Sequence, residues 1–318
     1  MTRLADAVRE RWQGFWFAPE TPVNLAAARL VLALQALWIL VSRDLPALSG
    51  LPAPFWSEVP ASGRWRYLIW EGRPGLETVL QALVLVALAG VVLGVATRAC
   101  CLAAGLLLYH LAPLETLFFT PSPWAKGLTI PVLGLLTLAT ARCGDALALR
   151  PGRGVAPPDA DGWALRLVRL FVCQQYLFSG YAKLREAGMA WASPENMRAW
   201  LLLANLDDQL VVFREPGLWI ADRPLLCALM GAGALAMDLG FVSALVSVRA
   251  RRVIVPAALC FHLVILVTLN YAFLGAPLLL LMLDWSSLAR RRAQPSSSGS
   301  GGSSTSAGSG SGFTASPS

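Results

Sequence analysis

Five residues of one apolar segment recur at helical spacing and carry side chains that could do chemistry. Arg169, Cys173, Tyr176, Gly180 and Lys183 follow one another at steps of four, three, four and three residues. Side chains three or four residues apart lie on one face of an α-helix, so this spacing predicts a single stripe. The stripe would present a phenol, a position without a side chain and an amine to whatever packs against it.

Lys183 is open to two interpretations. A lysine at the end of an apolar helix often anchors that end at the membrane surface by snorkelling. In a partly desolvated pocket the ammonium form is penalised, and a neutral amine is a competent general base toward a phenol or hydroquinone. A Schiff base is a further use of lysine. The sequence contains none of the glycine-rich phosphate loops, GxSxG or HExxH motifs that mark other chemistries.

Three positions, one on this stripe and two after it in the chain, could meet a flat ring. At Gly180 the missing side chain lets a neighbouring helix or a flat ligand approach the backbone. Trp191 and Trp200 are typical of the aromatic belt at a membrane interface, although either ring could also stack on a flat ligand.

Other ionisable groups fall inside apolar segments, where each needs a partner or a task. Asp238 and His262 are expected at about the same depth, and Arg29 and Arg169 enter from the same side. Because buried charges are normally paired, we expect an inner ion-pair cluster of Arg29, Arg169 and Asp238. The alternatives are a proton relay or the polar wall of a cofactor cavity. For His110 we favour a hydrogen bond between helices.

The composition is that of a membrane protein. Of the 318 residues, 56% are hydrophobic and only 14% are charged. Soluble domains are about a quarter charged, so we expect an all-α polytopic membrane protein in contact with the lipid bilayer. The net charge of +7 does not indicate nucleic-acid binding, because the arginines form short clusters between apolar segments. The six cysteines have neither CxxC spacing nor histidines at zinc-ligand distances, so no metal site is expected.

Eight apolar segments are candidates for membrane spans, which need about 20 residues each. The fourth and the eighth are short and could be partly buried or re-entrant. The eight candidates are residues 24–42, 76–97, 99–118, 126–142, 163–184, 224–247, 253–272 and 274–289. Residues 294–318 are rich in Ser and Gly and are expected to form a disordered tail, which leaves residues 1–293 as one transmembrane domain.

The basic residues predict how the chain lies in the membrane. With eight spans both termini share a side, and the arginine clusters fall on that side, which should be the cytoplasm. We therefore expect a multi-pass protein of the bacterial inner membrane. Two longer segments, about 43–75 and 185–223, face outward, and their Trp and Pro content is typical of interfacial or re-entrant elements. Residues 1–17 are charged and amphipathic, as in an interfacial helix.

Four stretches resemble, in order, the membrane domain of the vitamin K-dependent gamma-carboxylase and its bacterial relatives, the horizontally transferred transmembrane (HTTM) domain family. AARLVLALQALW contains Arg29, and YLFSGYAKLREAGMAW resembles the family's (Y)xxxGxxKLxxxxW segment. GALAMDLGFVSALV places Asp238 in a glycine-rich span. CFHLVILVTLNYAFLGAPLLLLML resembles a Phe-His span that ends in a turn with Gly and Pro.

The resemblance implies a carboxylase/epoxidase-type membrane enzyme, a lyase, that acts on a small-molecule or protein substrate. In the carboxylase, the lysine of the GxxKL segment deprotonates a reduced quinone of the vitamin K type, with O2 and CO2 as co-substrates. Oxygen addition creates a strong base that removes a proton from a glutamate, and carbon dioxide traps the carbanion. Carried over, Lys183 is the catalytic base, and Tyr176, Gly180, Trp191 and His262 are the candidate cofactor-binding residues. Where the carboxylase has a further catalytic histidine, this chain reads SPWAKGLTI.

Two other classes of function are compatible with the sequence. One is a non-catalytic membrane protein that binds a lipophilic ligand or a partner subunit, in which Lys183 is an anchor and Asp238 is structural. The other is a small-solute transporter. The absence of an internal repeat and the grouping of the candidate site on one side both count against a transporter.

Overall fold

The computed structural model describes residues 2–42, 47, 74–112, 123–151, 161–206, 212–213 and 215–287. Over these residues the protein is helical and contains no strand, which confirms the all-α prediction for this part of the chain. The predicted tail 294–318 lies outside the described residues, as does most of the predicted outer segment 43–75.

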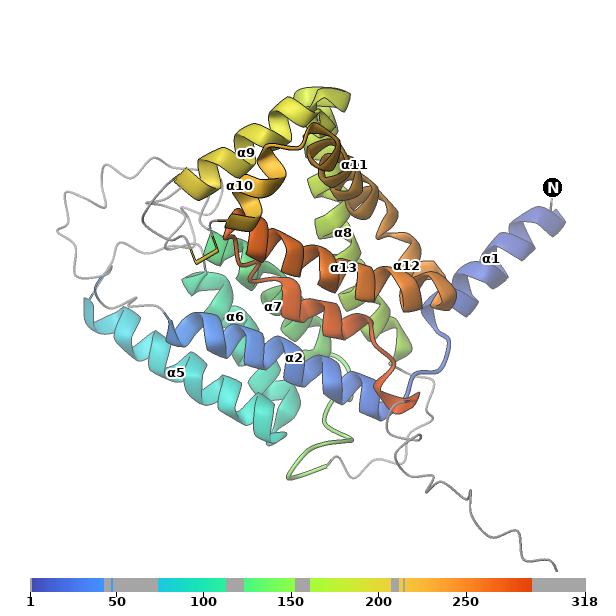
Figure 1. Ribbon diagram of the computed structural model, residues 1–318. Helices are drawn as coiled ribbons and strands as arrows, with labels where there is room; N and C mark the ends of the chain where they lie inside the picture. The colour runs from blue at the N-terminus through green and yellow to red at the C-terminus, as the bar shows by residue number, and fades with distance from the viewer. Residues whose placement is uncertain are drawn as a thin grey trace, which may run out of the picture.

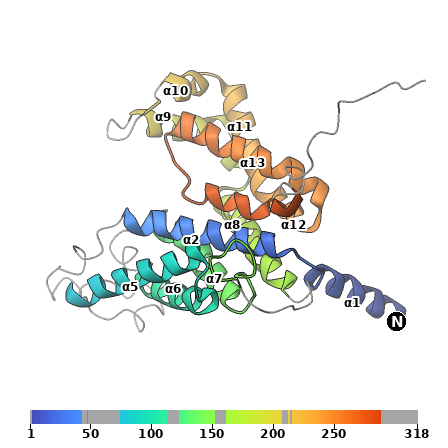
Figure 2. The same cartoon turned by 90° about the horizontal axis from the view of Figure 1, so that it is seen from below.

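Four helices of the first half form one packed group (Figures 1 and 2). They are α2 (Pro22–Val41), α5 (Pro74–Leu93), α6 (Thr97–Leu111) and α7 (Pro123–Ala139). Helix α2 packs on α5 and α7, and α6 packs between α5 and α7. Glycines allow close approach at two of these contacts, where Gly105 faces Leu136 and Gly134 faces Leu32.

The second half is built around one long helix. Helix α8 (Gly162–Ala187) packs on α7 of the first group and on α11 of the second, and so connects the two groups. The elements that follow α8 are η3 (Gly188–Ala192), α9 (Pro194–Leu206), α10 (Glu215–Ala221), α11 (Pro224–Gly240), α12 (Ser243–Val246), α13 (Val248–Leu269) and η4 (Ala276–Met282). A separate helix, α1 (Thr2–Trp16), projects from the bundle (Figure 1).

Within the described ranges, three helices are long and apolar enough to cross a membrane: α2, residues 75–93 of α5, and α13. The pair α10 and α11 adds a fourth if it is counted as one span, although it is bent by 104°. Large apolar side chains such as Trp38, Val86 and Leu263 are exposed on these helices. Apolar surface of this kind suits contact with lipid, and the fold is consistent with a multi-pass membrane protein.

The described elements differ from the eight expected spans at several places, and α8, in the expected fifth span, is not among the helices apolar enough to cross a membrane. Helices α6 and α7 have 15 and 17 residues, fewer than the roughly 20 that a span requires. Residues 276–282, in the expected eighth span, form a 3-10 helix of seven residues. At about 2 Å per residue this helix covers roughly 14 Å, about half of the hydrocarbon thickness.

The expected ion-pair cluster of Arg29, Arg169 and Asp238 does not form. The guanidinium of Arg169 lies 3.6 Å from the carboxylate of Glu20 and donates to the carbonyls of Leu281 (3.0 Å) and Leu283 (3.2 Å).

Arg29 lies apart from both groups. Its guanidinium is fully buried, donates to the carbonyl of Leu147, and pairs with no carboxylate in the described part of the chain. The predicted cluster is replaced because Lys183 pairs with Asp238, Glu20 and two backbone carbonyls face Arg169, and a carbonyl of the turn after α7 accepts from Arg29.

Replacing Arg169 should destabilise the fold, because it removes the cation paired with Glu20 and the donor of the Leu281 and Leu283 carbonyls. For Arg169→Met we expect a loss of about 3–5 kcal/mol in the free energy of unfolding, as for a buried pair that loses one partner. Unfolding of the purified protein by SDS would measure this. Arg252→Gln, at an exposed arginine of α13, is the control and should be near neutral. Equal effects of the two changes would contradict the assignment.

Candidate functional site

The candidate site lies along one face of α8, near its C-terminal end. The helix ends at Ala187 and is followed by Gly188, whose φ of +57° is a backbone conformation that glycine adopts easily. The five residues of η3 then turn the chain back, which brings Trp191 beside the last turns of α8. Helix α11 packs against α8 and η3 and closes the site from the other side.

Lys183 is held by two partners. Its Nζ donates to Oδ2 of Asp238 at 2.6 Å, and the same nitrogen lies 4.4 Å from the centroid of the Trp191 ring. The Asp238 side chain is only 5% exposed, whereas that of Lys183 is 23% exposed. The arrangement combines a charge-assisted hydrogen bond with a cation–π contact, both in a desolvated setting where such interactions are strongest. Asp238, expected in an inner cluster, is therefore the partner of the candidate base.

Gly180 is the point where α8 and α11 approach most closely at this site. A Cβ atom on Gly180 would lie 2.9 Å from Cβ of Asp238 and 2.9 Å from Cδ2 of Leu239. Of the two occupants considered for this position, the neighbouring helix fills it. Gly231 of α11 makes a similar close approach to the backbone of Ala192 in η3. The glycines thus set the distance at which Asp238 can reach Lys183.

Tyr176 and His262 form a second polar contact on the same stripe. Tyr176 Oη lies 2.6 Å from His262 Nε2, and either group can donate, depending on the histidine tautomer. The Tyr176 ring stacks on Phe241 with centroids 4.0 Å apart, and His262 lies 4.7 Å from Phe273. His262 Nδ1 is buried without a hydrogen-bond partner in the described protein.

The two polar contacts are close together along α8. Tyr176 precedes Lys183 by seven residues, about 10 Å of helix, and precedes Gly180 by one turn. Asp238 packs at the level of Gly180 and His262 meets Tyr176, so these two partners lie roughly one turn apart along α8. The structure groups Tyr176, Gly180, Lys183, Trp191, Asp238 and His262 in one region, and it leaves Arg29 and Arg169 outside it.

The sequence interpretation missed several contacts. Phe241 and Phe273 carry no signal that separates them from other apolar residues. Glu77, in contrast, is an acidic residue inside a candidate span, and this signal could have marked it as a partner for His110. Their side chains lie 3.6 Å apart, between α5 and α6, and the Glu77 side chain is almost fully buried. Among the described residues no group of three His, Cys, Asp or Glu side chains could hold a metal.

A side chain at Gly180 should push α11 away from α8. We expect Gly180→Ala to destabilise the protein by about 1–3 kcal/mol, because the new methyl group overlaps Asp238 and Leu239. Gly233→Ala, in α11, is the matched control because its Cβ would meet nothing within 4 Å, so it should be neutral or stabilising by up to about 1 kcal/mol. SDS unfolding of both variants would decide, and a neutral Gly180→Ala would contradict the close approach.

Removing the Tyr176 hydroxyl should leave His262 Nε2 without its partner. We expect Tyr176→Phe to lower the free energy of unfolding by about 1–3 kcal/mol, the usual cost of an unsatisfied buried polar group. Tyr181→Phe, on an exposed tyrosine of the same helix, should have little effect. If both variants unfold alike, the hydrogen bond contributes nothing to stability.

No family model, curated protein or solved structure matched this chain in the comparisons.

Proposed function

We propose that this protein is a membrane enzyme that removes a proton from a lipophilic weak acid, with Lys183 as the base, and that it resembles the vitamin K-dependent gamma-carboxylase in using a reduced quinone. The observation that carries the proposal is the contact of Lys183 with Asp238 and Trp191. An anchor at the membrane surface would need neither a buried carboxylate nor an aromatic face.

The Lys183–Asp238 pair can accept a proton as a unit. In one route the ammonium of Lys183 first passes a proton to the carboxylate of Asp238, and the resulting neutral amine takes a proton from the bound acid. In the other route the carboxylate of Asp238 takes the proton of the bound acid directly. Both routes end in the same state, with Lys183 and Asp238 protonated and the ammonium facing the new anion. An ammonium already fixed beside the reacting atom stabilises that anion without reorganising at the moment of reaction.

The residues around the pair suit a quinol. The buried Nδ1 of His262 has no partner within the described residues, so it can meet a hydroxyl or carbonyl oxygen. The ring of Phe273, which is 41% exposed, adds apolar surface next to the imidazole. Tyr176 orients the imidazole through its other nitrogen. When bound, a reduced quinone would supply, with O2, the base strength needed to ionise a carbon acid that CO2 then carboxylates.

The proposal includes how the chain crosses the membrane and on which side its termini lie. Eight spans, both termini in the cytoplasm and location in the bacterial inner membrane rest on the arginine distribution. In that arrangement Arg166 and Arg169 mark the cytoplasmic end of α8, and Lys183 marks its outer end, beneath α9 and α10. The site would then open outward.

A non-catalytic role is the second candidate, and one observation favours it. The contact at Gly180 is filled by protein, and the Lys183–Asp238 pair satisfies two charges that helix packing brings together. In this second candidate the only task of the pair is to fix α11 on α8, and the protein binds a lipophilic ligand or a partner subunit.

The test compares quinol turnover in variants that keep the fold. Lys183→Met alone strands a buried carboxylate, so the informative variant is Lys183→Met with Asp238→Met, which replaces the pair by apolar side chains. Arg185→Met removes an exposed cation two residues away and is the matched control. With vitamin K-type hydroquinones, we expect oxygen uptake and epoxide formation to fall at least 100-fold in the double variant and to persist in the control. Turnover would be followed with CO2, with and without a glutamate-containing peptide.

Lys183→Arg then separates the two routes of proton transfer. Arginine keeps the charge but does not give up its proton, so loss of turnover in a folded Lys183→Arg protein identifies Lys183 as the base. Retained turnover would assign that role to Asp238. Background activity in the wild type, the double variant and the control, across several quinols, would refute the enzymatic proposal and favour the non-catalytic role.

A further inference from the structure

Helix α1 is fixed to the bundle at one end only. Arg166 of α8 donates to the carbonyls of Ala18 (2.9 Å) and Trp16 (3.4 Å), and Phe15 packs against the core. A Cβ atom at Gly162 would overlap the carbonyl of Ala18, so the start of α8 touches the chain just after α1. Earlier residues of α1 project from this attachment (Figures 1 and 2).

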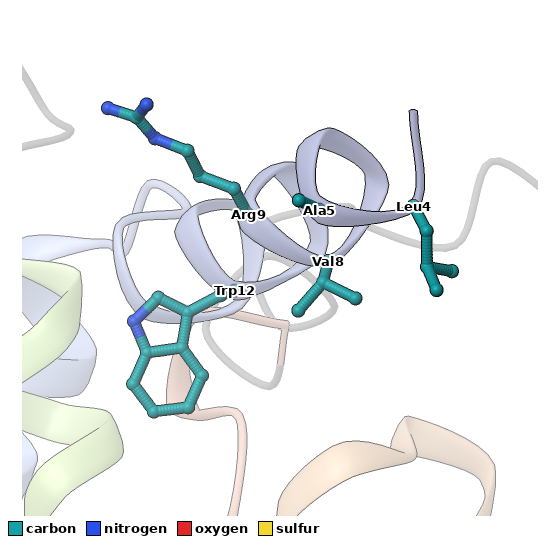
Figure 3. Close-up of a pocket in the computed structure, with 5 residues that line it drawn as sticks. All are labelled: Leu4, Ala5, Val8, Arg9 and Trp12. Carbon is teal, nitrogen blue, oxygen red and sulfur yellow. The ribbon is translucent and has the colours of Figure 1, made fainter. Parts of the chain in front are cut away.

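The projecting part carries an apolar face that no described residue of another element covers. Leu4, Val8 and Trp12 recur every four residues and are 75%, 60% and 62% exposed. Together with Ala5 and Arg9 they line a shallow pocket formed by α1 alone (Figure 3). Large exposed apolar residues in one row mark an interaction surface, in contrast to single exposed residues.

Two of the three arginines of α1 border this face. At about 100° per residue, Arg9 and Arg11 fall on its two opposite borders, whereas Asp6 and Glu10 fall on the far side together with Arg3. Border arginines can extend to phosphate groups while the apolar face is buried, and the carboxylates then stay in water. This distribution is complementary to an anionic lipid surface.

The attachment places α1 next to the start of α2, a helix long and apolar enough to cross a membrane, which is where a membrane boundary would lie. Helix α1 ends at Trp16, and the apolar helix α2 begins at Pro22. Between them, Glu20 accepts from Asn24 and faces Arg169. An amphipathic helix at that level can bury its apolar face some 5–10 Å into the boundary between headgroups and acyl chains.

We propose that α1 docks on the bilayer surface and selects anionic lipids, through the apolar face of Leu4, Val8 and Trp12 and the guanidinium groups of Arg9 and Arg11. The bilayer is the occupant that fits, because the spans of the same chain hold α1 beside it. This interaction is independent of the Lys183 site and of the function proposed for it.

The test uses spin labels on the full chain in vesicles. In a background with Cys100→Ala and Cys260→Ala, which removes the more accessible thiols, a label is placed at Val8→Cys or, on the far face, at Gln13→Cys. Vesicles contain phosphatidylcholine with or without phosphatidylglycerol. In the presence of phosphatidylglycerol, we expect the position-8 label to collide mostly with O2 and the position-13 label mostly with a water-soluble nickel chelate.

Arg9→Gln with Arg11→Gln should lower the docked-to-undocked ratio of α1 by about 30-fold in vesicles with phosphatidylglycerol, as expected for two basic residues near an anionic surface. In phosphatidylcholine alone the two changes should have little effect. Equal exposure of both labels to nickel in both kinds of vesicle would overturn the proposal. Exclusion of both reagents at position 8 would overturn it too, in favour of a protein partner or a second copy.

Discussion

The arrangement of the second half of the protein depends on one constraint, which is that Lys183 and Asp238 must meet in an apolar setting. A buried carboxylate is costly unless it is paired, and at 2.6 Å the ammonium of Lys183 satisfies it. The pair can form only because Gly180 lets α11 come within van der Waals contact of α8. The turn at Gly188 then returns Trp191 to the same ammonium, so three elements converge on one nitrogen.

Helix α8 carries polar groups at several levels, and each level joins a different neighbour. Near its start Arg169 faces Glu20 and carbonyls at the end of η4. Further along, Tyr176 meets His262 of α13, and near the end of α8 Lys183 meets Asp238 of α11. Polar contacts between helices are specific where apolar packing is not, because each donor must find its acceptor. Helices α11 and α13 are thereby fixed relative to the face of α8 that carries the candidate chemistry.

The sequence predicted the local features well and the partners poorly. The stripe of Tyr176, Gly180 and Lys183 follows from helical spacing, which is a property of the chain alone. The partner of Asp238 depends on how α11 packs, and Arg169 is satisfied by backbone carbonyls of Leu281 and Leu283, so neither follows from spacing. Glu20 lies outside every apolar segment, so the sequence carries no signal that pairs it with Arg169. The position of Trp191 depends on the backbone of a single turn at Gly188.

The central claim is that Lys183 and Asp238 form one interacting unit, and a double-mutant cycle tests it most directly. Unfolding free energies of the wild type, Lys183→Met, Asp238→Met and the double variant give the coupling between the two side chains. We expect each single change to be strongly destabilising and the double variant to recover much of that loss, with a coupling of about 1.5–3 kcal/mol. Effects that add to within about 0.5 kcal/mol would contradict the pair.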